Sequence, residues 1–80
     1  MRRGSPFYRP RPVAVAASRH GVPLRVAGRA VVAVRESWLV EDGWWSERPL
    51  ARRYWEVVVE GGRDVVVFKD LRSGRWFWQR

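Results

Sequence analysis

The chain has 80 residues, no cysteine, and sixteen Lys and Arg against eight Asp and Glu, which gives a net charge of +8. This length allows one small domain, and the lack of cysteine excludes disulfides and thiolate metal sites. No apolar run approaches the roughly 18–20 residues that cross a bilayer, so we expect a cytoplasmic protein that does not enter membranes.

Residues 1–12 are predicted to form a flexible basic tail. Four arginines alternate there with prolines, which lack the N–H that a strand ladder needs. Such a tail is either an unstructured leader or a basic arm that wraps an anionic partner. Residues 13–80 are expected to form a single β domain, because no segment spaces its apolar residues as a helix would.

The first half of this domain contains turn signals between short apolar runs. Residues 13–17 alternate apolar with small side chains, and residues 18–21 are typical of a turn. A hairpin is predicted over residues 24–34, with a tight turn at Ala27-Gly28. Residues 35–39 could hold one helical turn, but Trp38 to Val40 more closely fit the start of another extended piece.

The second half carries the clearest strand pattern. Residues 53–60 and 63–69 are rich in valine and aromatic residues, and Gly61-Gly62 between them predicts a two-residue turn. Glycine tolerates the positive φ that a type I′ turn requires at both central positions. A second turn is predicted over residues 70–75, which places Asp70 opposite Arg75 and brings a third strand alongside.

The predicted register decides which side chains share a face. A two-residue turn sets Val57 opposite Val66 and Trp55 opposite Phe68, and the second turn adds Phe77 opposite Phe68. The other face would then carry Tyr54, Glu56, Val58, Val65, Val67, Lys69, Trp76, Trp78 and Arg80. A solvated face would not hold two tryptophans beside valines, so this face is either covered by the first half of the chain or is a contact surface.

These patterns predict an all-β fold, a small, SH3-like antiparallel barrel or strongly bent sheet of five to six strands. An enzyme is not expected. The single histidine, His20, lies in a predicted turn without a second histidine or a cysteine to complete a metal site. Gly61-Gly62 is too short to cradle phosphate and precedes a strand instead of a helix, so no cofactor is expected either.

The one functional signal is the mixture of basic and aromatic residues, which is typical of proteins that stack bases and track phosphates of single-stranded nucleic acid. The candidate residues are Trp44, Trp45, Arg48, Arg52, Arg53, Lys69, Arg72, Arg75, Trp76, Trp78 and Arg80. The alternative is that most of these tryptophans fill the core of a small barrel. Because adjacent residues of a strand face opposite ways, one of Trp44 and Trp45 is expected to be exposed.

Several of these segments together resemble a known family. They are Gly43-Trp44-Trp45, Pro49, Arg53-Tyr54-Trp55, Phe68-Lys69-Asp70 and Arg75-Trp76-Phe77-Trp78-Gln79-Arg80. Their order and spacing over residues 29–80 resemble uncharacterised small bacterial domains associated with Y-family translesion polymerases and the mutasome. The resemblance implies a compact β domain in DNA repair and assigns no residue a role. This chain departs from the pattern in its Arg/Pro leader and in stopping at Arg80.

Three functions follow as expectations. The domain contacts DNA, with single strands favoured; or it is an adaptor that binds a Y-family-polymerase-like protein through exposed tryptophans, the residue type enriched at binding hot spots. A third reading is a structural barrel that forms a homodimer through Trp76 and Trp78.

Overall fold

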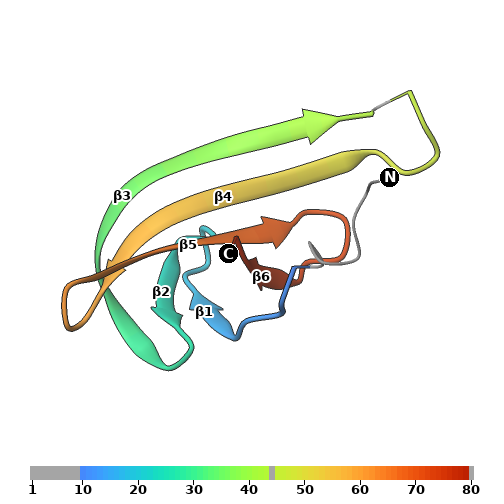
Figure 1. The fold of residues 1–80 in the computed structure, drawn as a ribbon. Coiled ribbons are helices and arrows are strands. Elements are labelled where there is room, and N and C mark those ends of the chain that lie inside the picture. The colour runs from blue at the N-terminus through green and yellow to red at the C-terminus, as the bar shows by residue number, and fades with distance from the viewer. Residues whose placement is uncertain (1–9, 44, 80) are drawn as a thin grey trace.

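A computed structural model describes residues 10–43 and 45–79. It contains six strands: β1 (Val15–Ala17), β2 (Pro23–Val26), β3 (Arg29–Asp42), β4 (Leu50–Val59), β5 (Arg63–Asp70) and β6 (Trp76–Trp78) (Figure 1). Each strand pairs antiparallel with the next, so the sheet order follows the chain. The expected all-β, strongly bent sheet is therefore confirmed. In this part of the chain no helix is long and apolar enough to cross a membrane.

The sheet curls until its two ends meet through the segment that precedes β1. The N–H of Val13 donates to the carbonyl of Trp76 (3.0 Å), and the N–H of Trp78 donates to the carbonyl of Arg11 (2.8 Å). Pro12 forms an isolated bridge to the same strand. Residues 11 and 12, which we expected within the tail, thus belong to the sheet, whereas the expected disorder of residues 1–9 lies outside the described residues.

The core lies on the concave, inner face of this curl. Its centre is four valines, each at most 2% exposed: Val26, Val57, Val59 and Val67. Partly buried side chains pack around them, namely Val13, Val15, Val31, Trp55, Val65, Trp76 and Trp78. On β4 and β5 these are all odd-numbered positions, because successive strand side chains alternate between the two faces. The strands β1 and β2 fold over this face and close it (Figure 1).

Three of the predicted turns are confirmed. The Ala27–Gly28 turn is closed by the pair Val26 and Arg29, and both central residues have positive φ, 50° and 82°. In the turn over residues 18–21, the N–H of Gly21 donates to the carbonyl of Ser18 (2.8 Å). In the turn over residues 70–75, the N–H of Asp70 donates to the carbonyl of Arg75 (2.8 Å).

The two-residue turn at Gly61-Gly62 is wrong. The loop has three residues, Glu60 to Gly62, and Val59 is paired with Arg63. A two-residue hairpin requires the backbone groups of its closing residues to point at each other. The N–H of Glu60 instead donates to the carbonyl of Ala30 beside the start of β3 (2.9 Å), so it cannot close a turn with Arg63.

This one-residue shift rearranges the faces of the sheet. Val57 lies opposite Val65 and Trp55 opposite Val67, so the odd-numbered residues of β5 join the inner face. The second turn has the predicted register, with Phe68 opposite Phe77. The two tryptophans of β6 therefore turn inward, and the two phenylalanines share the outer, convex face with Tyr54.

β3 is a single strand of 14 residues rather than two extended pieces. It carries β-bulges between Val31 and Ala33 and between Val34 and Glu36, and beyond them its pairing with β4 is regular. The β3–β4 hairpin projects beyond the rest of the sheet, and residues 43 and 45–49 lie at its tip (Figure 1).

Candidate nucleic-acid interface

The outer face carries four aromatic rings in a line across the sheet, one from each of β3 to β6. We call Trp38, Tyr54, Phe68 and Phe77 the aromatic row. The Trp38 and Tyr54 rings are stacked with centroids 5.3 Å apart and planes 2° apart. Tyr54 and Phe68 follow at 5.1 Å, and Phe68 and Phe77 at 5.3 Å. Cross-strand pairing aligns these residues, and ring contacts of this kind contribute about 0.5–1.5 kcal/mol each beyond their buried area.

Two arginines lie over the aromatic row. The guanidinium carbon of Arg52 is 4.4 Å from the Phe68 ring centroid, and that of Arg75 is 5.4 Å from the Phe77 centroid. Arg52 also donates from Nη1 to the Tyr54 hydroxyl (3.2 Å). These are cation–π distances, so each ring draws a guanidinium onto the outer face. Arg52 and Arg75 are thereby held over the aromatic row.

Beside the row lies an open groove of about 580 Å³, which we call the arginine groove. It is lined by residues of two segments that meet there: Arg48, Pro49, Leu50, Ala51, Arg52, Asp70, Arg72 and Ser73. Two hydrogen bonds join the segments: the N–H of Leu71 donates to the carbonyl of Ala51 (2.9 Å), and Nη1 of Arg72 donates to the carbonyl of Pro49 (3.4 Å). The groove therefore brings Arg72 together with Arg48 and Arg52, which come from a segment about twenty positions earlier in the chain.

Asp70 is the one carboxylate in the groove lining, and it accepts hydrogen bonds from residues of its own turn. The N–H of Arg72 donates to Oδ1 (3.0 Å) and the Ser73 hydroxyl donates to Oδ2 (3.1 Å). Burial raises the pKa of Asp70, but these hydrogen bonds, with the charge of Arg52, outweigh it and hold the pKa below its ordinary value. The groove thus has three positive charges against one negative charge.

The basic residues of the groove have no carboxylate within ion-pair distance. Among the described residues the only ion pairs are those of Arg35, with Glu56 (3.7 Å) and Asp64 (3.6 Å). The pKa of Glu56 is raised, first by burial and then by the neighbouring charge of Asp64. Glu56 and Asp64 therefore both form ion pairs with Arg35 on the outer face. No group of three or more acidic or histidine side chains in the described part of the chain is placed to bind a metal ion.

The hairpin tip presents an exposed ring three positions before the first arginine of the groove. Trp45 is 70% exposed, as expected for one residue of the Trp44-Trp45 pair. The tip is an ordered turn: the Ser46 N–H and hydroxyl both donate to the carbonyl of Gly43 (2.8 and 2.7 Å), and the N–H of Arg48 donates to the Ser46 hydroxyl (3.2 Å). The same turn therefore positions Trp45 and the first arginine of the groove.

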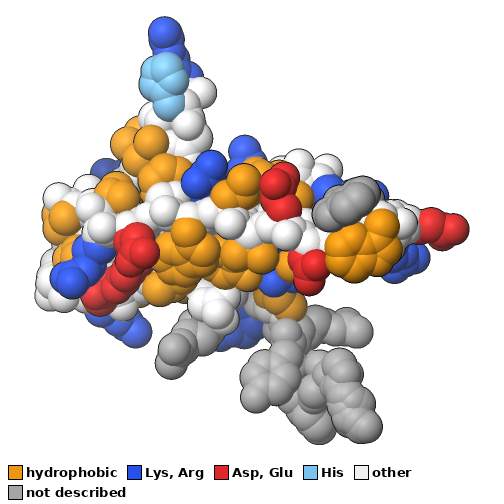
Figure 2. Space-filling model, turned by 90° about the horizontal axis from the view of Figure 1, so that it is seen from above, with side chains coloured by type: hydrophobic (Ala, Val, Ile, Leu, Met, Phe, Trp, Pro, Cys, Tyr) orange, Lys and Arg blue, Asp and Glu red, His pale blue; other side chains and the backbone are white. Residues whose placement is uncertain are grey.

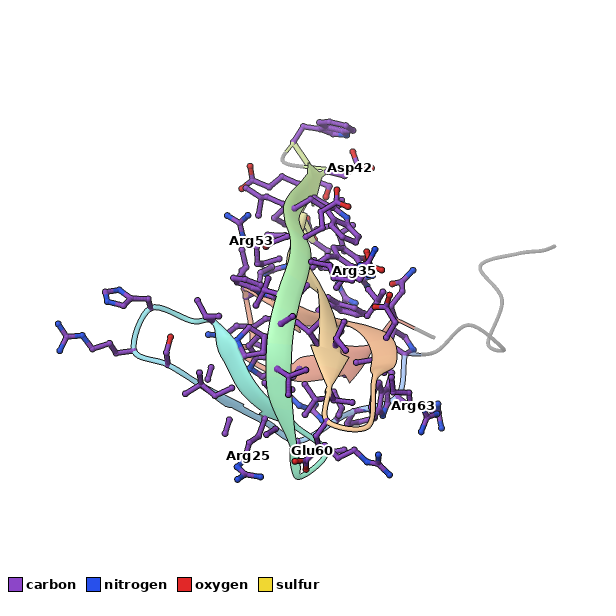
Figure 3. The ribbon with its side chains drawn as sticks, turned by 90° about the vertical axis from the view of Figure 1, so that its left-hand side faces the viewer. Arg25, Arg35, Asp42, Arg53, Glu60 and Arg63 are labelled. Carbon is purple, nitrogen blue, oxygen red and sulfur yellow. The ribbon has the colours of Figure 1, made fainter. Side chains whose placement is uncertain are left out.

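The other predicted site residues lie elsewhere. Arg53 and Lys69 are directly opposite each other on the inner-face side, and Figure 3 shows Arg53 and Arg35 on opposite sides of β3. Trp76 and Trp78 pack against the core, which corrects the register that placed them beside Tyr54 and Glu56. Trp44 and Arg80 lie outside the described residues.

Sequence reasoning missed the aromatic row as a unit. Trp38 was placed only in an extended piece, and Tyr54 and Phe68 were assigned to different faces. The pairing of Trp38 with Tyr54 depends on the two bulges of β3, which the sequence does not mark with glycine or proline. The usable signal was weaker: Trp38 begins a short apolar run, Trp38 to Val40, that is typical of an extended strand.

A second hollow of about 540 Å³ lies toward the other end of the sheet, where Figure 3 shows Glu60 and Arg63. Its charged lining mixes three arginines with two carboxylates: Arg11, Arg29, Arg63, Glu56 and Asp64. Mixed charge gives a weaker attraction for a polyanion than the groove offers.

No protein-family profile, curated protein or solved structure matches the chain. The resemblance to translesion-associated domains is therefore still a prediction from the residues.

Proposed function

We propose that this domain is a non-catalytic nucleic-acid-binding module that holds a single strand along the arginine groove. The observation that supports this most directly is the meeting of Arg48, Arg52 and Arg72 in one open groove, where none of them forms an ion pair with another described residue. Guanidinium groups bind phosphate in a bidentate manner, and three of them along a groove can follow successive phosphates.

Trp45 supplies the stacking surface that such a site needs. Proteins that bind single strands combine a positive groove with rings on which bases stack, and each stacked base contributes about 1–3 kcal/mol. Trp45 is exposed in the same turn that holds Arg48. A strand with its phosphates in the groove would therefore pass this ring at the hairpin tip.

A single strand fits this surface better than duplex DNA. A two-stranded ribbon can enter the major groove, and the β3–β4 hairpin has that form. However, Glu41, Asp42 and Glu47 surround its tip and would be driven against the phosphates of a duplex. A flexible strand can stack a base on Trp45 at the tip and direct its phosphates into the arginine groove, away from these carboxylates.

In biological terms we place this binding in DNA repair, as the resemblance over residues 29–80 suggests. A domain that holds exposed template near a Y-family-polymerase-like protein would suit translesion synthesis. An adaptor role toward such a polymerase is the second candidate, and it would use a protein-binding surface apart from the groove.

The test is a titration of the protein with single-stranded and duplex oligonucleotides, followed by tryptophan fluorescence and repeated at several salt concentrations. We expect quenching, a preference for single strands, and a log–log salt slope of about −0.7 per phosphate neutralised. Weak binding without quenching, or equal binding to duplex, would count against the groove and in favour of an adaptor.

A further inference from the structure

The edge of β3 that faces away from β4 is open over most of its length. β2 pairs only with Arg29 and Ala30 at the start of the strand, and no strand of the described part of the chain pairs along that side from residue 31 to 42. Figure 1 shows β3 as the outermost strand, with β4 on its other side. An open edge offers unpaired backbone N–H and C=O groups on which an extended segment can add as a further strand.

The direction of the backbone groups follows from the strand alternation. Because the carbonyl of Ala51 accepts from Leu71, the backbone groups of Ala51 point away from β3. Those of the next residue, Arg52, therefore point toward β3, and so do those of Tyr54. Their opposite residues are Val40 and Trp38, which must use their own backbone groups to pair with β4.

The intervening residues of β3 then face outward. Ser37, Leu39 and Glu41 direct their N–H and C=O groups to the open edge, which provides three donors and three acceptors in regular spacing. The earlier part of the strand is unsuitable, because its two bulges, between residues 31 and 36, break the regular repeat. The edge that can accept a strand is thus the regular segment 37–42, which we call the acceptor edge.

Charge selects the partner of the acceptor edge. From Glu36 to Glu47 the chain has four carboxylates and neither Lys nor Arg, although the whole chain carries a net charge of +8. Apolar side chains lie among them, and Leu39 is 44% exposed. Figure 2 shows acidic side chains among hydrophobic ones along this side of the molecule, with basic side chains around them. A second copy of the strand would bring the same carboxylates into contact, so self-pairing is disfavoured.

We infer that the acceptor edge binds an extended segment of a partner protein in which basic and apolar residues alternate. The segment adds to the sheet next to β3, with backbone hydrogen bonds to Ser37, Leu39 and Glu41. Because side chains alternate along a strand, its basic side chains lie on the face of Glu36 and Asp42 and its apolar side chains on the face of Leu39. This surface lies apart from the arginine groove, so the inference does not depend on nucleic-acid binding.

Hydrogen exchange followed residue by residue tests the geometry. As probe we would use a fluorescein-labelled decapeptide that alternates valine and arginine, with a valine–glutamate peptide as control. In the free protein, the amides of Leu39 and Glu41 should exchange fast and those of Trp38 and Val40 slowly. On addition of the basic peptide, Leu39 and Glu41 should become protected, and the acidic peptide should have no effect.

Substitutions test the edge independently. Leu39→Pro removes an outward N–H without breaking a bond to β4, so it should keep the fold and weaken peptide binding about tenfold or more. Leu39→Thr, which keeps the N–H, and Leu71→Ala, at an exposed leucine elsewhere, are the controls. Glu36→Gln should weaken binding about two- to fivefold, as expected for an exposed ion pair.

Three results would overturn the inference. One is a lack of peptide binding at about 1 mM peptide, a concentration that detects a binding free energy of only about 4 kcal/mol. Another is binding that leaves the Leu39 and Glu41 amides unprotected or is unaffected by Leu39→Pro. The third is a dimer of the peptide-free protein that Leu39→Pro dissociates, which would assign the edge to a second copy.

Discussion

Arg52 lies with its guanidinium 4.4 Å from the centre of the Phe68 ring while its side chain also lines the groove beside β4. Phe68 is only 2% exposed, so the arginine helps to cover a buried ring on the convex face of the sheet. One side chain therefore contributes both to the packing of the aromatic row and to the positive charge of the arginine groove. Its replacement should separate these two contributions.

Arg52→Lys should lower stability more than it lowers nucleic-acid binding. Lysine keeps the charge but not the planar group that stacks on Phe68 and donates to Tyr54, and the loss should be about 1 kcal/mol. For a domain of this size that corresponds to a fall in Tm of about 4–8 °C, measurable by thermal unfolding. Arg53→Lys, at the adjacent residue on the opposite face, is the control and should change the Tm much less.

The double substitution Arg48→Ala and Arg72→Ala should flatten the salt dependence of single-strand binding. Each phosphate contact that is lost should reduce the log–log slope by about 0.7. The matched control is Arg19→Ala with Arg25→Ala, which removes the same charge from exposed positions away from the groove. An equal loss of slope in both double variants would mean that net charge, and not the groove, governs binding.

Trp45→Ala and Trp78→Ala should have opposite consequences. Loss of the exposed Trp45 should weaken single-strand binding about 5- to 150-fold, the equivalent of 1–3 kcal/mol of stacking, with little change in stability. Loss of Trp78, which packs on the valine core, should lower the free energy of unfolding by about 3 kcal/mol. Binding and denaturant unfolding of each variant give the comparison, and a binding defect confined to folded Trp78→Ala would contradict the placement of the site.

Ala27→Asn should stabilise the protein. Ala27 has a φ of 50° at the first central position of a two-residue turn, where the alanine side chain is strained by about 1 kcal/mol or more. Asn-Gly is the preferred sequence for such a turn, so the gain should be about 0.5–1 kcal/mol. Urea unfolding measures it, and Ala16→Asn, at an exposed alanine of β1, serves as control. A loss of stability would show that the turn adopts another conformation.

The stability of the fold should fall in acid partly through Asp70. Its pKa is lowered in the folded state, so its contribution is complete above the ordinary carboxyl value of 3.8 and is lost as the pH falls through the lower folded value. Asp70→Asn should flatten this part of the pH profile. Glu56 should affect stability in the opposite direction. Because its pKa is raised in the folded state, its ionisation lowers the stability of the fold as the pH rises above 4.5. Glu56→Gln therefore separates the two effects when unfolding is measured from pH 7 to pH 3.

Local signals predicted most of the turns and strands but not the faces of the sheet. The Ala27–Gly28 turn and the turn from Asp70 to Arg75 depend on neighbouring residues, and both were predicted correctly. The Gly61-Gly62 turn failed because the bond from Glu60 to Ala30 joins residues 30 positions apart, which no local pattern reveals. Since side chains alternate with a period of two, this single error placed Trp76 and Trp78 on the face of Tyr54 instead of the face of Val57.

The sequence predicted which residue types form the candidate site but not which of the candidate residues lie together. Arg48, Arg52 and Arg72 were all among the candidate residues, yet so were Arg53 and Lys69, which face the other side of the sheet. Deciding between them requires the tertiary approach of residues 70–73 to residues 48–52. The aromatic row could not be predicted because the bulges of β3 set the partner of Trp38.

Because of its two bulges, β3 is also longer than the stretch of β4 with which it pairs. Between Val31 and Glu36 the strand contains two residues more than its partner needs, Val32 and Arg35. Deleting Val32 would convert one bulge into regular pairing and leave Trp38 opposite Tyr54, whereas a deletion between residues 37 and 42 would have to be absorbed at the hairpin tip or would turn every following side chain to the other face. Natural variation in the length of this strand should therefore be concentrated at residues 32 and 35, and the remainder of the hairpin should keep a constant length.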